Sequence, residues 1–68
     1  MDTLFSERLK ELRLENKMKQ SQVADKLGVS VTCYAGYEQG YRQPDLKMLA
    51  KICRLFDISS DYLIGLED

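Results

Sequence analysis

The stretch Gln20–Gln39, QSQVADKLGVSVTCYAGYEQ, decides the fold of this 68-residue chain. Its apolar residues recur at helical spacing on both sides of Gly28. Glycine adopts the left-handed backbone that ends a helix without steric cost, and Ser30 offers a side-chain oxygen to the first turn of the next helix. The stretch therefore predicts two helices, at 20–27 and 31–39, joined by a tight turn. The side chains expected to face inward are Val23, Ala24, Leu27, Tyr34 and Tyr37.

Three more amphipathic helices are predicted outside this stretch, and no segment alternates as a half-buried strand would. One, Leu4–Asn16, precedes the stretch, and two, Leu46–Phe56 and Ser60–Ile64, follow it. Asp45 and Ser59 stand where the two later helices need an N-cap. The expected inward residues are Phe5, Leu9 and Leu12 in the first helix and Leu46, Leu49, Ala50, Cys53 and Phe56 in the fourth. The apolar residues of the fifth helix are Tyr62 and Leu63. Residues 1–68 are thus expected to form one compact all-α domain of five helices with short connections.

The composition argues against several classes of function. With no histidine, no glycine-rich phosphate loop and no evident catalytic carboxylate pair, the chain is not expected to be an enzyme or to bind a cofactor or small molecule. Two cysteines, Cys33 and Cys53, match no zinc pattern, so no metal is expected; they are interpreted as reduced core residues rather than as a disulfide. No apolar run exceeds three residues and no signal-peptide pattern opens the chain, which predicts a cytoplasmic protein without a membrane segment.

Charge is distributed unevenly along the chain. The net charge is −1, whereas nucleic-acid binding usually needs a basic surface. Between Lys17 and Arg42, however, there are four cations and two anions, and between Asp61 and Asp68 there are three anions and no cation. Any surface that contacts nucleic acid is therefore expected in the middle of the chain.

Several short motifs occur in order and at fixed spacing over almost the whole chain. They are Arg8–Arg13, Gln20 with Ala24, Leu27–Ser30, Tyr37–Gly40, Pro44, Leu49, Ile58–Ser59 and Asp61–Gly65. Taken together, the sequence resembles the Cro/phage-repressor, or XRE-type, helix-turn-helix family. The resemblance implies a five-helix lambda-repressor-like fold with its helix-turn-helix motif at about residues 20–39. It also implies a sequence-specific transcriptional regulator, most often a repressor, that binds double-stranded DNA.

The resemblance also implies roles for individual residues. Gln20 corresponds to a glutamine that contacts a DNA phosphate and braces the second helix of the motif. Tyr41 and Arg42 lie in a loop that corresponds to one reaching the sugar-phosphate backbone, and Arg13 and Glu38 correspond to a partly buried ion pair. Lys19 departs from the family, which usually has Ser or Thr as the N-cap there; it loses about 1 kcal/mol of capping and offers a phosphate contact instead.

The positions expected to face base edges are unusual in composition. They are Val31, Thr32, Ala35 and Gly36. None is an Arg, Lys, Asn or Gln, which read bases through bidentate hydrogen bonds. Val31 and Thr32 are expected to contact thymine methyl groups, and Gly36 either to let the helix approach DNA closely or to reflect relaxed demands on this surface.

Partners are less well defined than the fold. A homodimer on a palindromic operator is expected, with Ile64 and Leu66 as the best candidates for its contact. The same two residues could instead close the monomer core or dock a C-terminal domain. The neutral base-facing side chains and the acidic net charge leave a second hypothesis open, an antitoxin-like or adaptor-like protein-interaction module on the same fold with weak DNA affinity.

Overall fold

The structure is a computed structural model that describes residues 3–65. These residues form five α-helices and no strand: α1 (Thr3–Glu15), α2 (Gln20–Leu27), α3 (Val31–Gln39), α4 (Leu46–Phe56) and α5 (Ser60–Ile64). The predicted all-α fold is confirmed, and only α1 differs from its predicted bounds, by one residue at each end. None of the helices in residues 3–65 combines the length and apolar character needed to cross a membrane.

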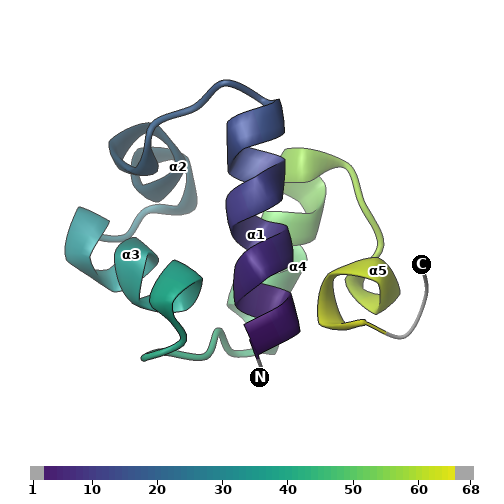
Figure 1. Ribbon diagram of the computed structural model, residues 1–68. Helices are drawn as coiled ribbons and strands as arrows, with labels where there is room; N and C mark the ends of the chain where they lie inside the picture. Colours follow the sequence, from purple (N-terminus) through teal and green to yellow (C-terminus); the bar gives the residue numbers. More distant parts are fainter. Residues whose placement is uncertain (1–2, 66–68) are drawn as a thin grey trace.

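Figure 1 shows how the helices surround the first one. α2 and α3 lie on one side of α1, α5 lies on the other side, and α4 runs behind it. All five helices contribute to one buried core, whose largest fully buried side chains include Tyr34, Phe5, Leu9 and Ile52. The inward residues predicted for α1, α2 and α3 are all in this core.

Side-chain caps begin three of the helices where the sequence places them. The side-chain oxygens of Ser30, Asp45 and Ser59 accept hydrogen bonds from the backbone N–H groups of Cys33, Met48 and Tyr62, at 3.0, 2.8 and 3.1 Å. Each bond satisfies an N–H that has no partner inside its helix. The starts of α3, α4 and α5 are therefore defined by local sequence.

The predicted inward face of α4 is partly wrong. Leu49 and Phe56 are buried as expected, but Leu46 is 84% exposed and the fully buried residue is Ile52. Apolar residues lie on both flanks of α4, so spacing alone did not select the flank that meets the core. The buried side passes through residues 49, 52 and 56, which leaves Leu46 in the first turn outside the core, and Ala50 exposed as well.

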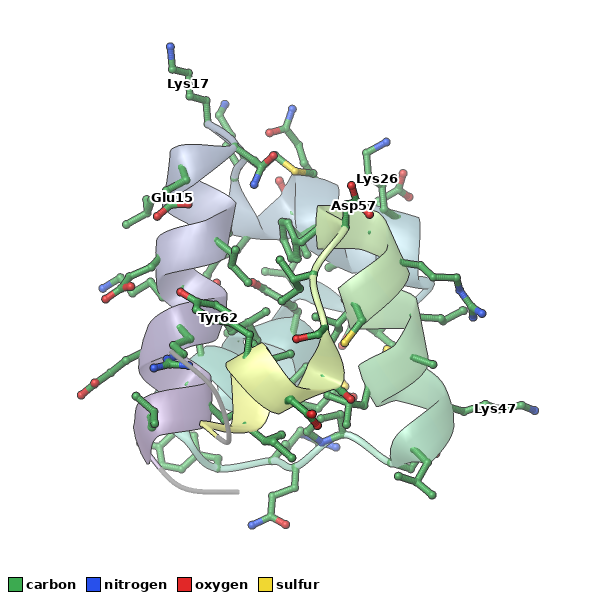
Figure 2. The ribbon with its side chains drawn as sticks, turned by 90° about the vertical axis from the view of Figure 1, so that its right-hand side faces the viewer. Glu15, Lys17, Lys26, Lys47, Asp57 and Tyr62 are labelled. Carbon is green, nitrogen blue, oxygen red and sulfur yellow. The ribbon has the colours of Figure 1, made fainter. Side chains whose placement is uncertain are left out.

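One arginine and one lysine side chain connect helices that are distant in sequence. Arg8 of α1 lies over the Tyr62 ring of α5, 4.4 Å from its centroid, and donates a hydrogen bond to the Tyr62 carbonyl oxygen. Figure 2 shows Tyr62 extending from α5 toward α1. Lys51 of α4 donates to the carbonyl oxygen of Leu27 at the end of α2, at 3.2 Å. These contacts hold α5 and α4 against the α1–α2 part of the molecule.

The remaining expectations concern the two cysteines and the apolar residues near the end of the chain. Cys33 and Cys53 are both free and half-buried, and burial raises the pKa of the Cys53 thiol. Ile64 is half-buried and packs against the core. Leu66, the other residue expected at a dimer contact, lies outside the described residues.

Candidate nucleic-acid interface

Backbone hydrogen bonds fix the turn between α2 and α3. Gly28 has φ 76°, in the left-handed region, and its N–H and that of Val29 return to the carbonyls of Asp25 and Ala24 at 3.1 and 3.0 Å. Val29 is half-buried against the core, and Ser30 then caps α3. The direction in which α3 leaves α2 is thus set by backbone hydrogen bonds and by one buried side chain.

A buried ion pair connects α1 to the end of α3. Arg13 Nε lies 2.6 Å from Glu38 Oε2, and Arg13 Nη2 donates to Glu38 Oε1 at 3.1 Å. The two side chains are only 11% and 3% exposed. This two-point contact is the geometry in which an arginine–carboxylate pair is strongest. The ion pair that the family resemblance implies is therefore present.

Two further donors complete the surroundings of the Glu38 carboxylate. Gln20 Nε2 of α2 donates to Oε1 at 3.1 Å, and the Tyr34 hydroxyl donates to Oε2. Arg13 also donates from Nη1 to the Met18 carbonyl, at 3.0 Å. Glu38 thus joins α1, α2 and α3 at one point.

The protonation state of this cluster follows from its contacts. Burial alone would raise the pKa of Glu38, but the hydrogen bonds from Arg13, Tyr34 and Gln20 outweigh it and leave the pKa below its ordinary value. The hydrogen bond to Glu38 raises the pKa of Arg13. Burial, and then the bond to the carboxylate, raise the pKa of the Tyr34 hydroxyl. The pair is therefore fully ionised near neutral pH, and Tyr34 stays a donor.

Another buried contact, absent from the sequence-based predictions, joins α1 to α3. Ser6, which is buried, donates from its hydroxyl to the Tyr37 carbonyl at 2.9 Å. In the sequence, the signal for this contact is a serine directly beside Phe5, one of the apolar residues that α1 turns inward. The Tyr34 and Tyr37 rings pack edge to face, with centroids 6.4 Å apart. Burial, and then the contact with Cys33, raise the pKa of Tyr37 to about 12.

The opposite face of α3 is turned to solvent. Val31 is 45% exposed, Thr32 is exposed and Ala35 is half-buried. Gln39 is exposed too, and it follows Thr32 and Ala35 at seven and four residues, on the same side of the helix. Gln39 was not among the predicted base-facing residues, although it is a bidentate donor and acceptor at helical spacing from them.

The start of α2 lies beside α3 and exposes a cation. Lys19 is exposed and makes no side-chain cap, because its ammonium group cannot accept a hydrogen bond from a backbone N–H. Gln22 compensates in part, because its Oε1 accepts from the Lys19 N–H at 2.8 Å. Gln20 donates one amide N–H to Glu38 and has a second N–H in its amide group. Lys19 and Gln20 therefore stand together at the helix N-terminus.

Gly36 was predicted to lie on the open, base-facing side of α3, and the structure corrects this expectation. It is buried, and a Cβ placed on it would lie 3.0 Å from both Cγ and Cδ of Arg42. The side chain of Arg42 thus fills the space that a residue 36 side chain would take. The small size of this residue is explained by packing within the chain.

The loop after α3 begins with a tight return of the backbone. The N–H groups of Tyr41 and Arg42 both donate to the Gly36 carbonyl oxygen, at 2.9 and 3.2 Å. Tyr41 is 83% exposed, while Pro44 is buried and anchors the far end of the loop. Within residues 3–65, no cluster of three or more Cys, Asp or Glu residues could hold a metal ion. The geometry therefore presents polar and cationic groups around a helix, and offers no chelating site in the described part of the chain.

The family model described as helix-turn-helix matches residues 9–63 of this chain. The chain belongs to the helix-turn-helix family. One relative of this helix-turn-helix chain is the "Uncharacterized HTH-type transcriptional regulator YqaE" of Bacillus subtilis. The two sequences are 46% identical over 61 residues, and the alignment covers 90% of this chain and 53% of the relative. It spans about half the length of the curated relatives that it matches.

Solved structures give the same assignment for this helix-turn-helix chain. A transcriptional regulator from Listeria innocua superimposes with a TM-score of 0.88 and 31% identity, over 100% of this chain and 64% of the other. The P22 c2 repressor in complex with a synthetic operator superimposes with a TM-score of 0.84 and 26% identity, over 91% and 94%. The fold is therefore shared with DNA-binding repressor domains.

Proposed function

We propose that this chain binds duplex DNA by inserting α3 into the major groove and that it regulates transcription. The observation that carries the proposal is the division of α3 into two sides. Glu38 fixes one side to α1 and α2, and Val31 and Thr32 are exposed on the other. A rigidly held helix with an uncovered side is what groove insertion requires. The relatives, which are named as transcriptional regulators, support it.

In this proposal the start of α2 contacts the phosphate backbone. Helix N-termini present backbone N–H groups and a partial positive charge to anions. Lys19 adds a full charge there, and Gln20 adds its second amide N–H, since the first is bound to Glu38. Such contacts set affinity and orientation without reading sequence.

Base reading falls to apolar and hydroxyl groups at the start of α3. The Val31 side chain and the Thr32 methyl group suit thymine methyls, and the Thr32 hydroxyl can donate to or accept from either base type. Ala35 lies one turn further and adds a small apolar contact. Tyr41 lies at the edge of the same surface, where its hydroxyl suits a sugar or phosphate oxygen.

The proposal includes a two-fold complex. Two copies on a palindromic operator would place their α3 helices about 34 Å apart in successive major grooves. Ile64, half-buried on α5, is the described residue proposed for the contact between copies. The protein is proposed to act in the cytoplasm without catalysis.

Salt-dependent binding to DNA tests the function. Duplexes selected from a random pool would be titrated with the purified chain by fluorescence anisotropy between about 50 and 200 mM salt. We expect affinity to fall steeply with salt, because phosphate contacts release counterions, and a scrambled duplex to bind more weakly. No retention on any duplex at 50 mM salt would contradict the proposal and favour a protein-interaction module, for which the net charge of −1 and the neutral face of α3 speak.

A further inference from the structure

Gly36 leaves α3 without a side chain in its second half, at a position that the rest of the chain covers. Gly36 follows Thr32 by four residues, so the two lie one turn apart on the same side of the helix. A helical glycine costs about 1 kcal/mol relative to alanine. A residue of this kind in the middle of a nine-residue helix needs a structural reason.

The reason is the side chain of Arg42. Its Cγ and Cδ both lie 3.0 Å from the place of a Cβ at Gly36, and its Cβ lies 3.4 Å away. The backbone supports this placement, because the Arg42 N–H donates to the Gly36 carbonyl at 3.2 Å. The stem of the arginine therefore crosses α3 where residue 36 would otherwise project.

The charge of Arg42 also lies close to α3. It acts on the Tyr37 hydroxyl, whose pKa burial raises and this neighbouring positive charge moderates. Arg42 is nevertheless exposed, so its guanidinium remains accessible to a ligand. A cation thus accompanies an otherwise neutral helix face.

We propose that Arg42, seated across Gly36, reads a guanine in the major groove and supplies the bidentate contact that α3 itself lacks. A guanidinium donates two parallel N–H groups to guanine O6 and N7. This inference rests on the proposed DNA-binding function. It differs from the sugar-phosphate contact that the family resemblance implies for this loop, because a phosphate contact carries no sequence information.

The test compares Arg42→Gln with wild type by selecting duplexes from a random pool and sequencing them. Glutamine pairs with adenine N6 and N7, so one position of each half-site should change from guanine to adenine while the other positions stay the same. Affinity for the wild-type site should fall roughly 5- to 150-fold, whereas a site with the G-to-A change should recover much of it. Lys19→Gln is the matched control: it removes one exposed cation proposed to contact phosphate, and should weaken all sequences alike.

The possible results separate the inference from the function on which it depends. If wild type selects a clear motif and Arg42→Gln selects the same motif with uniformly lower affinity, Arg42 contacts only phosphate and the inference is overturned. If wild type selects no motif and binds no duplex, the inference and the proposed function are overturned together.

A second variant changes Gly36, over which the Arg42 side chain packs, and leaves Arg42 itself unchanged. Gly36→Leu keeps the charge of Arg42 and favours the helix, but its side chain occupies the space of the arginine stem. We expect the guanine preference to be lost at the same position, with the salt dependence nearly unchanged. A retained preference would overturn the role of Gly36. Circular dichroism melting of both variants checks that the helices are intact.

Discussion

The two sides of α3 are held very differently, although one nine-residue helix carries both. On the inner side, Tyr34 and Tyr37 are buried and Glu38 accepts bonds from three side chains on three helices. On the outer side, Val31 and Thr32 are exposed. The difference shows that the position of this helix and the chemistry that it presents are set by separate residues. Outer residues can therefore change without loss of the fold, and inner ones cannot.

Removing the carboxylate from the inner side should have the largest effect. Glu38→Ala leaves Arg13 partly buried without its anion, and breaking one partner of such a pair costs about 3–5 kcal/mol. Urea-induced unfolding followed by circular dichroism measures the loss. Glu15→Ala is the control, because Glu15 is an exposed carboxylate that projects from the end of α1 (Figure 2), and its loss should change stability by less than about 0.5 kcal/mol.

A double variant separates the charge from the packing. Arg13→Met with Glu38→Leu replaces both ions by apolar side chains, which often restores much of the stability lost in the single variant. If Glu38→Ala alone left the unfolding midpoint unchanged, the ion pair would not hold α3 in solution.

The same contrast between sides can be tested on α4. Ile52 is fully buried and Leu46 is 84% exposed, although they lie on the same short helix. Ile52→Ala should cost about 2–5 kcal/mol because it opens a cavity in the core. Leu46→Ala should cost less than about 0.5 kcal/mol. Equal losses in urea unfolding would mean that Leu46 is covered, as it would be by a partner.

Local signals in the sequence were sufficient to predict most of the fold. Gly28, Ser30, Asp45 and Ser59 act through their own backbone neighbours, so their caps and turns can be inferred from adjacent residues. The inner side of α4 could not be inferred in this way. It depends on which flank the other helices cover, and α4 is apolar on both flanks.

The candidate site was predictable to a similar extent. The ion pair between Arg13 and Glu38 came from the family resemblance, since its partners are 25 residues apart and no local pattern links them. The seat of Arg42 on Gly36 was missed because the loop after α3 folds back across the helix. The helical pattern places Gly36 on the outer side but contains no information about what covers it.

Acid should weaken the inner side less than removal of Glu38 does, because a protonated carboxyl group still fills its space. The pKa of Glu38 in the folded protein is lowered from its ordinary value of 4.5. Its contribution to stability is therefore complete above the unfolded-state pKa and is lost as pH falls through the lower folded-state pKa. Urea unfolding between pH 7 and pH 3 measures this loss.

Glu38→Gln is the reference for that pH series. Its amide does not titrate in this range, so the variant should lose stability at pH 7 and lose less than wild type on acidification. Parallel pH profiles for the two proteins would show that another carboxyl group governs the acid response.

Thr32→Ala, on the outer side, should have the smallest effect on the fold. Thr32 is exposed on α3, and alanine favours the helix, so the free energy of unfolding should change by less than about 0.5 kcal/mol. If the outer side reads DNA, the same change removes a hydroxyl and a methyl group from the base edges. It should then relax the preference at one position of each half-site in duplexes selected from a random pool. An unchanged base preference with unchanged stability would show that Thr32 does not contact the bases. Base contacts would then be assigned to Val31 and the neighbouring loop.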